Sequence, residues 1–262
     1  MVLESLVSVR EALENPLWVF IVGGFVSTTS LLVSFLLFSS SIGLMSTVLN
    51  TIALTPFMVS LLRFESALTE KSKVSDFVTV FQRHKIILKI YVALFAGMIF
   101  SYSIIYTILP EKYVEKLFED QIEQIKLIRG QFLGGTFLRI LLNNLGVLTV
   151  CYLFSFLYGA GAVFILSWNA SVLATAIGLS AKALGGFKAL PLAVMIYLPH
   201  GSLELIGYFM GGIAGGILSS ALKKGRLYTF SRILKDSLIF FAWGASFIIL
   251  GAIVESLLIY FS

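Results

Sequence analysis

The chain has 262 residues, of which 58% are hydrophobic and only 13% are charged, and its formal net charge is +5. This balance lies far outside that of soluble globular domains, and several apolar runs exceed the roughly 18 residues that indicate a membrane-spanning helix. The composition therefore excludes soluble enzyme folds. It predicts an all-α fold, a polytopic bundle of about seven transmembrane segments that forms one integral membrane domain over residues 1–262.

The first apolar stretch runs from residue 17 to residue 62 and is long enough for two spans. Small polar residues between Phe38 and Gly43 favour a tight hairpin, so spans are expected near 17–38 and 42–62. The stretch is too long for a cleavable signal peptide and lacks its basic leader, so the first span is expected to be retained.

The loops that follow predict the orientation. Residues 63–89 carry six basic residues against three acids, whereas residues 110–139 carry five of each. The positive-inside rule therefore predicts that the first loop and the amino terminus are cytoplasmic and that the second loop is external. A third span is expected near 86–109, with His84 in the cytoplasmic loop before it. The basic residues of this loop are Arg63, Lys71, Lys73, Arg83, Lys85 and Lys89.

Residues 110–136 predict an external amphipathic helix, because apolar residues recur at spacings of three and four. We expect this helix to lie along the bilayer surface or to cap the bundle, and the alternative is a docking surface for an external partner. The apolar positions are Val114, Leu117, Phe118, Ile122, Ile125, Ile128 and Phe132.

The carboxy-terminal half predicts four further spans, near 137–158, 162–181, 189–222 and 237–260. The connection between the last two, which includes Lys224 and Arg226, is again basic and therefore predicted to be cytoplasmic. The turn at Gly159–Gly161 is short, which leaves open that the fourth and fifth segments are tilted or re-entrant.

The predicted span near 189–222 contains the motif Pro199-His200-Gly201-Ser202-Leu203-Glu204. Within the sequence, Glu204 is the only acid between Glu123 and Asp236. Titratable groups at membrane depth are rare and usually functional. Proline removes a backbone donor and glycine permits unusual dihedral angles, so a helix broken or kinked at Pro199–Gly201 is predicted. If helix resumes there, His200 and Glu204 lie one turn apart on one face.

Three asparagines also lie in apolar surroundings: Asn143, Asn144 and Asn169. An amide without a partner is costly in hydrocarbon, so these side chains are expected to face inward, either for interhelical hydrogen bonds or to bind a ligand or ion. Together with His200, Gly201 and Glu204 they form the predicted functional centre. Glycines at a spacing of four predict a close helix-packing face, formed by Gly207, Gly211, Gly212, Gly215 and Gly216.

The Pro-His-Gly-x-x-Glu motif is followed by a glycine-rich run and preceded by these asparagines. This combination resembles the SpoIIM family of stage II sporulation protein M. The resemblance predicts a SpoIIM-like core over residues 137–222, although Ala170 stands where relatives typically have glycine after Asn169. The family takes its name from a bacterial complex in which the membrane protein anchors or coordinates peptidoglycan-degrading enzymes. Because similar proteins occur in organisms without spores, the resemblance implies a membrane scaffold or transport component rather than a sporulation role.

Three functions are therefore considered. The first is a noncatalytic membrane protein that organises a complex, since the lone Cys151 has no histidine or acid beside it in the sequence. The second is a transporter or channel subunit with a polar intramembrane site. The third is an intramembrane metalloenzyme in which His200 and Glu204 bind a metal. A catalytic zinc usually needs a third protein ligand, and the only other histidine, His84, lies in the predicted cytoplasmic loop.

No metal or cofactor is expected. The expected partners are membrane lipids and either another protein or a second copy of the chain, in the cell membrane. Nucleic-acid binding is not expected, because the predicted topology already accounts for the basic charge.

Overall fold

The computed structural model describes residues 9–71, 76–132, 137–223 and 227–261, and these ranges hold ten α-helices and one short 3₁₀ helix. Seven of the described helices are long and apolar enough to cross a membrane, which confirms the predicted all-α, multi-pass bundle. The predicted loop residues Lys73, Lys224 and Arg226 lie outside the described residues. The elements are α2 (Val9–Glu14), α3 (Pro16–Leu37), α4 (Ile42–Lys71), α5 (Phe77–Ile108), α6 (Glu111–Leu117), α7 (Glu119–Phe132), α8 (Phe137–Tyr158), α9 (Ala162–Ala183), η1 (Gly186–Ala189), α10 (Leu190–Lys223) and α11 (Leu227–Phe261).

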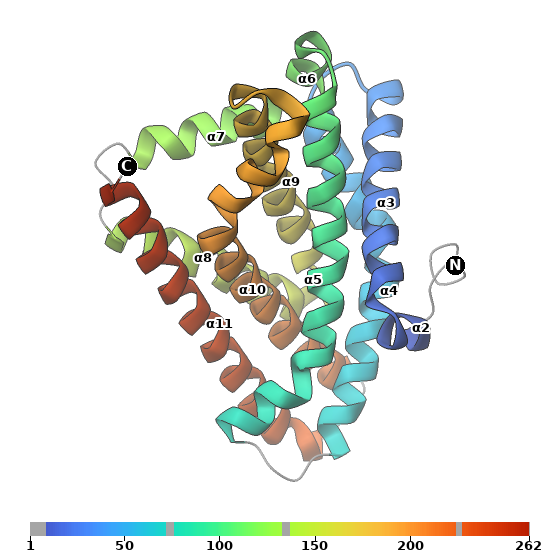
Figure 1. Ribbon diagram of the computed structural model, residues 1–262. Coiled ribbons are helices and arrows are strands. Elements are labelled where there is room, and N and C mark those ends of the chain that lie inside the picture. Colours follow the sequence, from blue (N-terminus) through green and yellow to red (C-terminus); the bar gives the residue numbers. More distant parts are fainter. Residues whose placement is uncertain (1–8, 72–75, 133–136, 224–226, 262) are drawn as a thin grey trace.

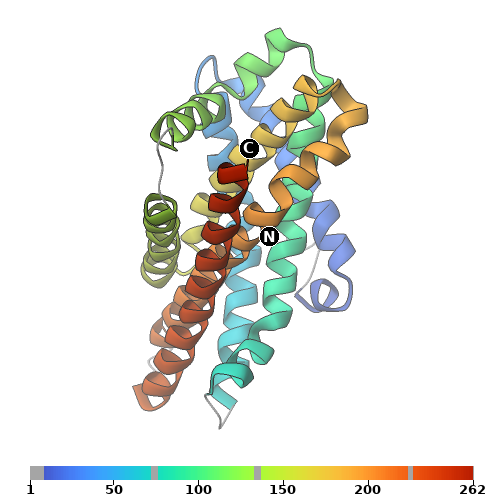
Figure 2. The ribbon, with the colours of Figure 1, turned by 60° about the vertical axis from the view of Figure 1, so that its left-hand side comes forward.

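The helices form one bundle with α10 in its interior (Figures 1 and 2). In the most apolar part of α10, 89% of the residues are buried, against 28% for α8. Helices α6 and α7 lie at the end of the bundle where α4 begins, and α7 runs across that end (Figure 1). The opposite end holds the end of α4 and the beginnings of α5 and α11 (Figure 1).

Helix α5 starts nine residues before the predicted span, at Phe77 rather than near residue 86. Asp76 caps it, because its side chain accepts a hydrogen bond of 3.0 Å from the backbone N–H of Thr79. The prediction that His84 lies in a loop is therefore wrong, since His84 is a fully buried residue of the second turn of α5. Charge counts locate the side of the membrane but not the end of a helix.

Of the break or kink predicted at Pro199–Gly201, the break is wrong, because α10 is helical from Leu190 to Lys223 with Pro199 inside it. Figures 1 and 2 show the helix bent in its first half rather than interrupted. A proline loses one backbone hydrogen bond and clashes with the preceding turn, and a bend relieves that clash. Continuing the helix keeps the other backbone groups paired, which matters most where no water is available.

The glycines of α10 lie where neighbouring backbones approach closely. A Cβ atom at Gly207 would lie 2.9 Å from the carbonyl oxygen of Gly244 on α11, and one at Gly211 would lie 2.8 Å from that of Leu148 on α8. At Gly215 a Cβ atom would collide with the carbonyl oxygen of Tyr152. The remaining two, Gly212 and Gly216, face Ala162 and the carbonyl oxygen of Gly159, respectively. These glycines therefore pack α10 against helices of its own chain.

Helices α3 and α5 make a second close contact that the sequence analysis did not identify. A Cβ atom at Gly23 would collide with the carbonyl oxygen of Leu94, and one at Gly97 would collide with that of Phe20. Small residues that let two helix backbones touch are a main source of helix association in membranes.

Where one amphipathic helix was predicted over residues 110–136, the described part of this range forms two helices, α6 and α7, which meet at Phe118. Residues 133–136 lie outside the described residues. The Phe118 ring is buried beside the rings of Tyr102 and Tyr106, with centroids 6.0 and 5.2 Å away. The chain bends at Phe118 so that this ring is buried, and the bend separates α6 from α7. Asp120 then accepts a 3.0 Å hydrogen bond from the N–H of Leu44, near the start of α4, so α7 is fastened to the bundle.

Candidate functional site

Three helices bring their polar side chains together in what we call the Glu204 cluster: Asn144 of α8, His200, Glu204 and Tyr208 of α10, and Glu255 of α11. The three α10 residues are spaced four apart and so share one face. The amide nitrogen of Asn144 donates a 2.7 Å hydrogen bond to Oε1 of Glu204. The hydroxyl of Tyr208 donates a 2.9 Å bond to Oδ1 of Asn144. The carboxyl group of Glu255 is close enough to that of Glu204 for the two to interact electrostatically, and Gly251, one turn before Glu255, packs against the Glu204 side chain.

The Glu204 cluster lies at membrane depth. At about 1.5 Å per residue, Glu204 is about 21 Å from the start of α10 and about 28 Å from its end. Two ionised carboxyl groups side by side repel each other, and a bound proton or cation removes that repulsion.

His200 lies at the edge of the Glu204 cluster. Its Nδ1 atom is buried and makes no hydrogen bond, and its ring lies 6.0 Å from the ring of Tyr197. Glu255 is close enough to interact with it electrostatically. A buried nitrogen without a partner costs free energy, which makes His200 a position where a bound group would be favoured.

The other residues of the predicted centre lie around this cluster or away from it. Asn143 is exposed and donates a 3.2 Å bond to Oδ1 of Asn144. Asn169 is half-buried and donates to the carbonyl oxygen of Ile165 in its own helix, at 2.8 Å. Gly201 faces the side chain of Leu173 on α9. The structure thus joins Asn143 and Asn144 to Glu204, and no described hydrogen bond joins Asn169 to them.

Sequence reasoning did not include Tyr208 and Glu255 in the site. A signal existed for both: Tyr208 follows Glu204 by one helical turn, and Glu255 is an acid inside an apolar span.

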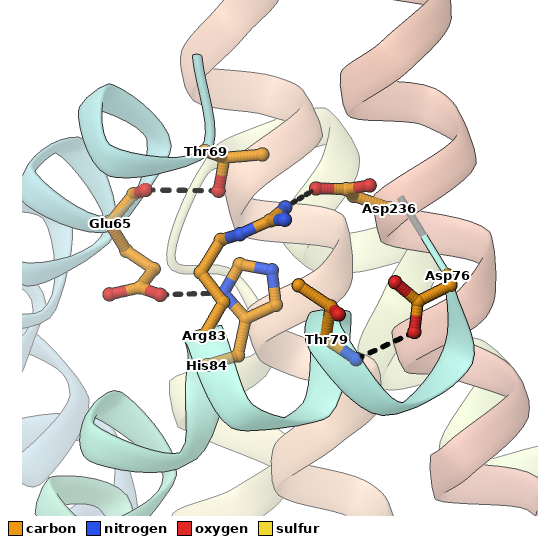
Figure 3. Close-up of polar contacts among 7 residues, drawn as sticks. All are labelled: Glu65, Thr69, Asp76, Thr79, Arg83, His84 and Asp236. Carbon is orange, nitrogen blue, oxygen red and sulfur yellow. Dashed lines mark hydrogen bonds and ion pairs between the residues drawn. The ribbon is translucent and has the colours of Figure 1, made fainter. Parts of the chain in front are cut away.

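A second group of charged residues, which we call the His84 cluster, joins α4, α5 and α11 at the opposite end of the bundle (Figure 3). Nδ1 of His84 lies 2.5 Å from Oε1 of Glu65, and both side chains are 1% exposed. The guanidinium group of Arg83 forms an ion pair with Asp236, whose side chain is 0% exposed. Consecutive residues of α5 therefore point to different helices, His84 to α4 and Arg83 to α11.

The His84 cluster is tightly packed. The imidazole of His84 lies 4.9 Å from the ring of Phe240.

Nearby, Asp76 lies outside the membrane-spanning part of α5, and its hydrogen bonds from Thr79 lower the pKa of its carboxyl group (Figure 3). The His84 cluster was not predicted, because residues 63–85, which include Glu65, Arg83 and His84, were expected to form a loop between two spans.

Neither cluster provides a ligand set for a metal, since the described residues hold no group of three or more histidine, cysteine, aspartate or glutamate side chains placed to bind one. His200 and Glu204 alone fall short of the three protein ligands that a catalytic zinc usually has.

A family model described as SpoIIM, stage II sporulation protein M, matches residues 86–258. No curated protein matches the chain, and no solved structure does. The matched region is wider than the predicted core of residues 137–222 and contains the whole Glu204 cluster. Of the His84 cluster it contains only Asp236.

Proposed function

The chain belongs to the SpoIIM family, as its motifs predicted, and we propose that it is a transport protein that carries a proton or a small monovalent cation through the Glu204 cluster. The observation that supports this proposal most directly is the neighbouring pair of carboxyl groups, Glu204 of α10 and Glu255 of α11, on two helices that are long and apolar enough to span a membrane. Placing ionisable groups there is costly, and such residues commonly mark ion or proton pathways.

The pair also provides a means of coupling. One carboxyl group belongs to α10 and the other to α11, and the Cγ atom of Glu204 would lie only 3.1 Å from a Cβ atom at Gly251 of α11. While the proton is bound, the two helices are joined. When the proton leaves, two neighbouring carboxylates repel each other, so the helices separate or a cation takes the place of the proton.

The test is flux in proteoliposomes that contain a pH-sensitive dye. The wild-type protein is expected to dissipate an imposed pH gradient, and Glu204→Gln is expected to reduce the flux to that of empty liposomes, because an amide does not exchange a proton. Glu123→Gln, at an exposed position of α7, is the matched control and should retain wild-type flux. Wild-type flux in a folded Glu204→Gln variant would contradict the proposal.

A scaffold role is the second candidate, and the outward face of α8 favours it. Asn143 is exposed there, and a Cβ atom at Gly146 would meet nothing within 4 Å. A polar amide and a glycine on a lipid-facing surface suit the approach of another helix. If the protein acts as a scaffold, Gly146→Leu should release a co-purifying membrane protein while Glu204→Gln retains it.

A further inference from the structure

A groove of about 360 Å³ runs along the outer side of α11, next to the start of α5. Its lining includes Phe77, Ser231, Leu234, Lys235, Leu238 and Ala242. It lies at the end of the bundle that the positive-inside rule assigns to the cytoplasm.

The groove is polar at one end and apolar along its length. Ser231 and Lys235 lie one turn apart near the start of α11, and Leu238 and Ala242 continue the same side of the helix toward its middle. From Ser231 to Ala242 the helix rises about 16 Å, which is about half the thickness of the hydrocarbon core. These dimensions suit one lipid within one leaflet.

Lys235 is exposed and lines the groove. The acid next to it in sequence, Asp236, is completely buried and paired with Arg83 inside the bundle. A lysine at the membrane surface contributes to the attraction of anionic lipids, and Ser231, one turn before Lys235, also lines the groove.

The wall of the groove is held in place by aromatic contacts. The ring of Phe77 stacks on Trp243 with centroids 4.2 Å apart, and the indole N–H of Trp243 donates a 2.9 Å hydrogen bond to the carbonyl oxygen of Phe77.

We infer that this groove binds a phospholipid with an anionic headgroup. The phosphate accepts hydrogen bonds from Lys235 and Ser231, and one acyl chain lies on Leu238, Ala242 and Phe77. A groove of similar size, about 340 Å³, lies between α3, α5, α9 and α10, but its lining carries no charged residue, so it has no group that selects a headgroup. The inference does not depend on the proposed transport activity.

The test is native mass spectrometry of the full chain released from nanodiscs that contain phosphatidylglycerol and phosphatidylcholine. The wild-type protein should retain phosphatidylglycerol in preference, and Lys235→Gln should weaken that retention by about fivefold. Lys188→Gln is the matched control, since Lys188 is an exposed lysine of η1 that does not line this groove. Equal retention of the two lipids, or equal loss in the two variants, would overturn the inference.

Leu238→Trp keeps every charge and fills the apolar part of the groove. It should lower the retention of phosphatidylglycerol while leaving the protein folded, because Leu238 is 52% exposed. Unchanged retention in this variant would also count against the site.

Discussion

The hydroxyl of Tyr208 is a single group on which the arrangement of the Glu204 cluster depends. It donates a hydrogen bond to the amide oxygen of Asn144, and the amide nitrogen of Asn144 donates one to Glu204. The bond from Tyr208 therefore orients the amide group that binds Glu204. Tyr208→Phe removes only the oxygen. We expect a loss of about 1 kcal/mol in the free energy of unfolding, measured by thermal unfolding in detergent.

Tyr158→Phe is the control for this change, because Tyr158 is 66% exposed at the end of α8. It should unfold at the same temperature as the wild-type protein. If both phenylalanine variants lose the same stability, the hydrogen bond to Asn144 contributes nothing.

The ion pairs of this protein differ in burial, and their contributions to stability should differ accordingly. Asp236→Ala removes the buried partner of Arg83 and is expected to cost about 3–5 kcal/mol. Arg10→Ala breaks an ion pair whose side chains are 88% and 65% exposed and is expected to cost about 0–1 kcal/mol. Denaturant unfolding of the purified variants compares the two, and equal losses would show that the buried pair is not formed.

At the scale of elements, the close contact between α8 and α10 leads to a sharper prediction. Gly215→Ala places a methyl group against the carbonyl oxygen of Tyr152, so the helices must move apart, at a cost of about 1–3 kcal/mol. Gly146→Ala is the matched change on α8, where the methyl group meets nothing. The unfolding temperature should fall in the first variant and stay unchanged in the second.

The helices themselves were largely predictable, and their ends and contacts were not. An apolar run such as residues 137–158 has few structures open to it in lipid, so its composition predicted the bounds of α8. His84 shows the limit, because a histidine between two basic residues resembles a loop unless the fold supplies Glu65 as its partner. Pro199 marks a lost hydrogen bond, but only the packing around α10 decides between a bend and a break.

The same limit applies to the site. The motif pointed to Glu204, and the paired asparagines pointed to Asn144, yet the two residues are 60 positions apart in the chain and nothing in their spacing predicts the contact between them. Asn169, selected for the same reason as Asn144, bonds to its own helix. An amide in an apolar segment needs a partner, and its own backbone is one of the partners available.

At the scale of the whole molecule, the predicted orientation can be tested with cysteine labelling, because the natural Cys151 is buried. Lys188→Cys introduces a thiol in η1, at the predicted external end, and Gln82→Cys introduces one in the exposed part of α5 at the other end. A membrane-impermeant maleimide should label the first in intact cells and the second only after the cells are opened. The reverse pattern would invert the topology.

The central position of α10 has a consequence for how the protein is made. This helix is the sixth span to leave the ribosome, yet it supplies the surfaces against which α8 and α11 pack. Until it has been synthesised, Leu148 and Tyr152 of α8 lack the glycines of α10 against which they pack. Helices α3 and α5 can pair early, but the docking of α8 is delayed until late in translation, and its contact face depends on lipid or on insertion factors until then.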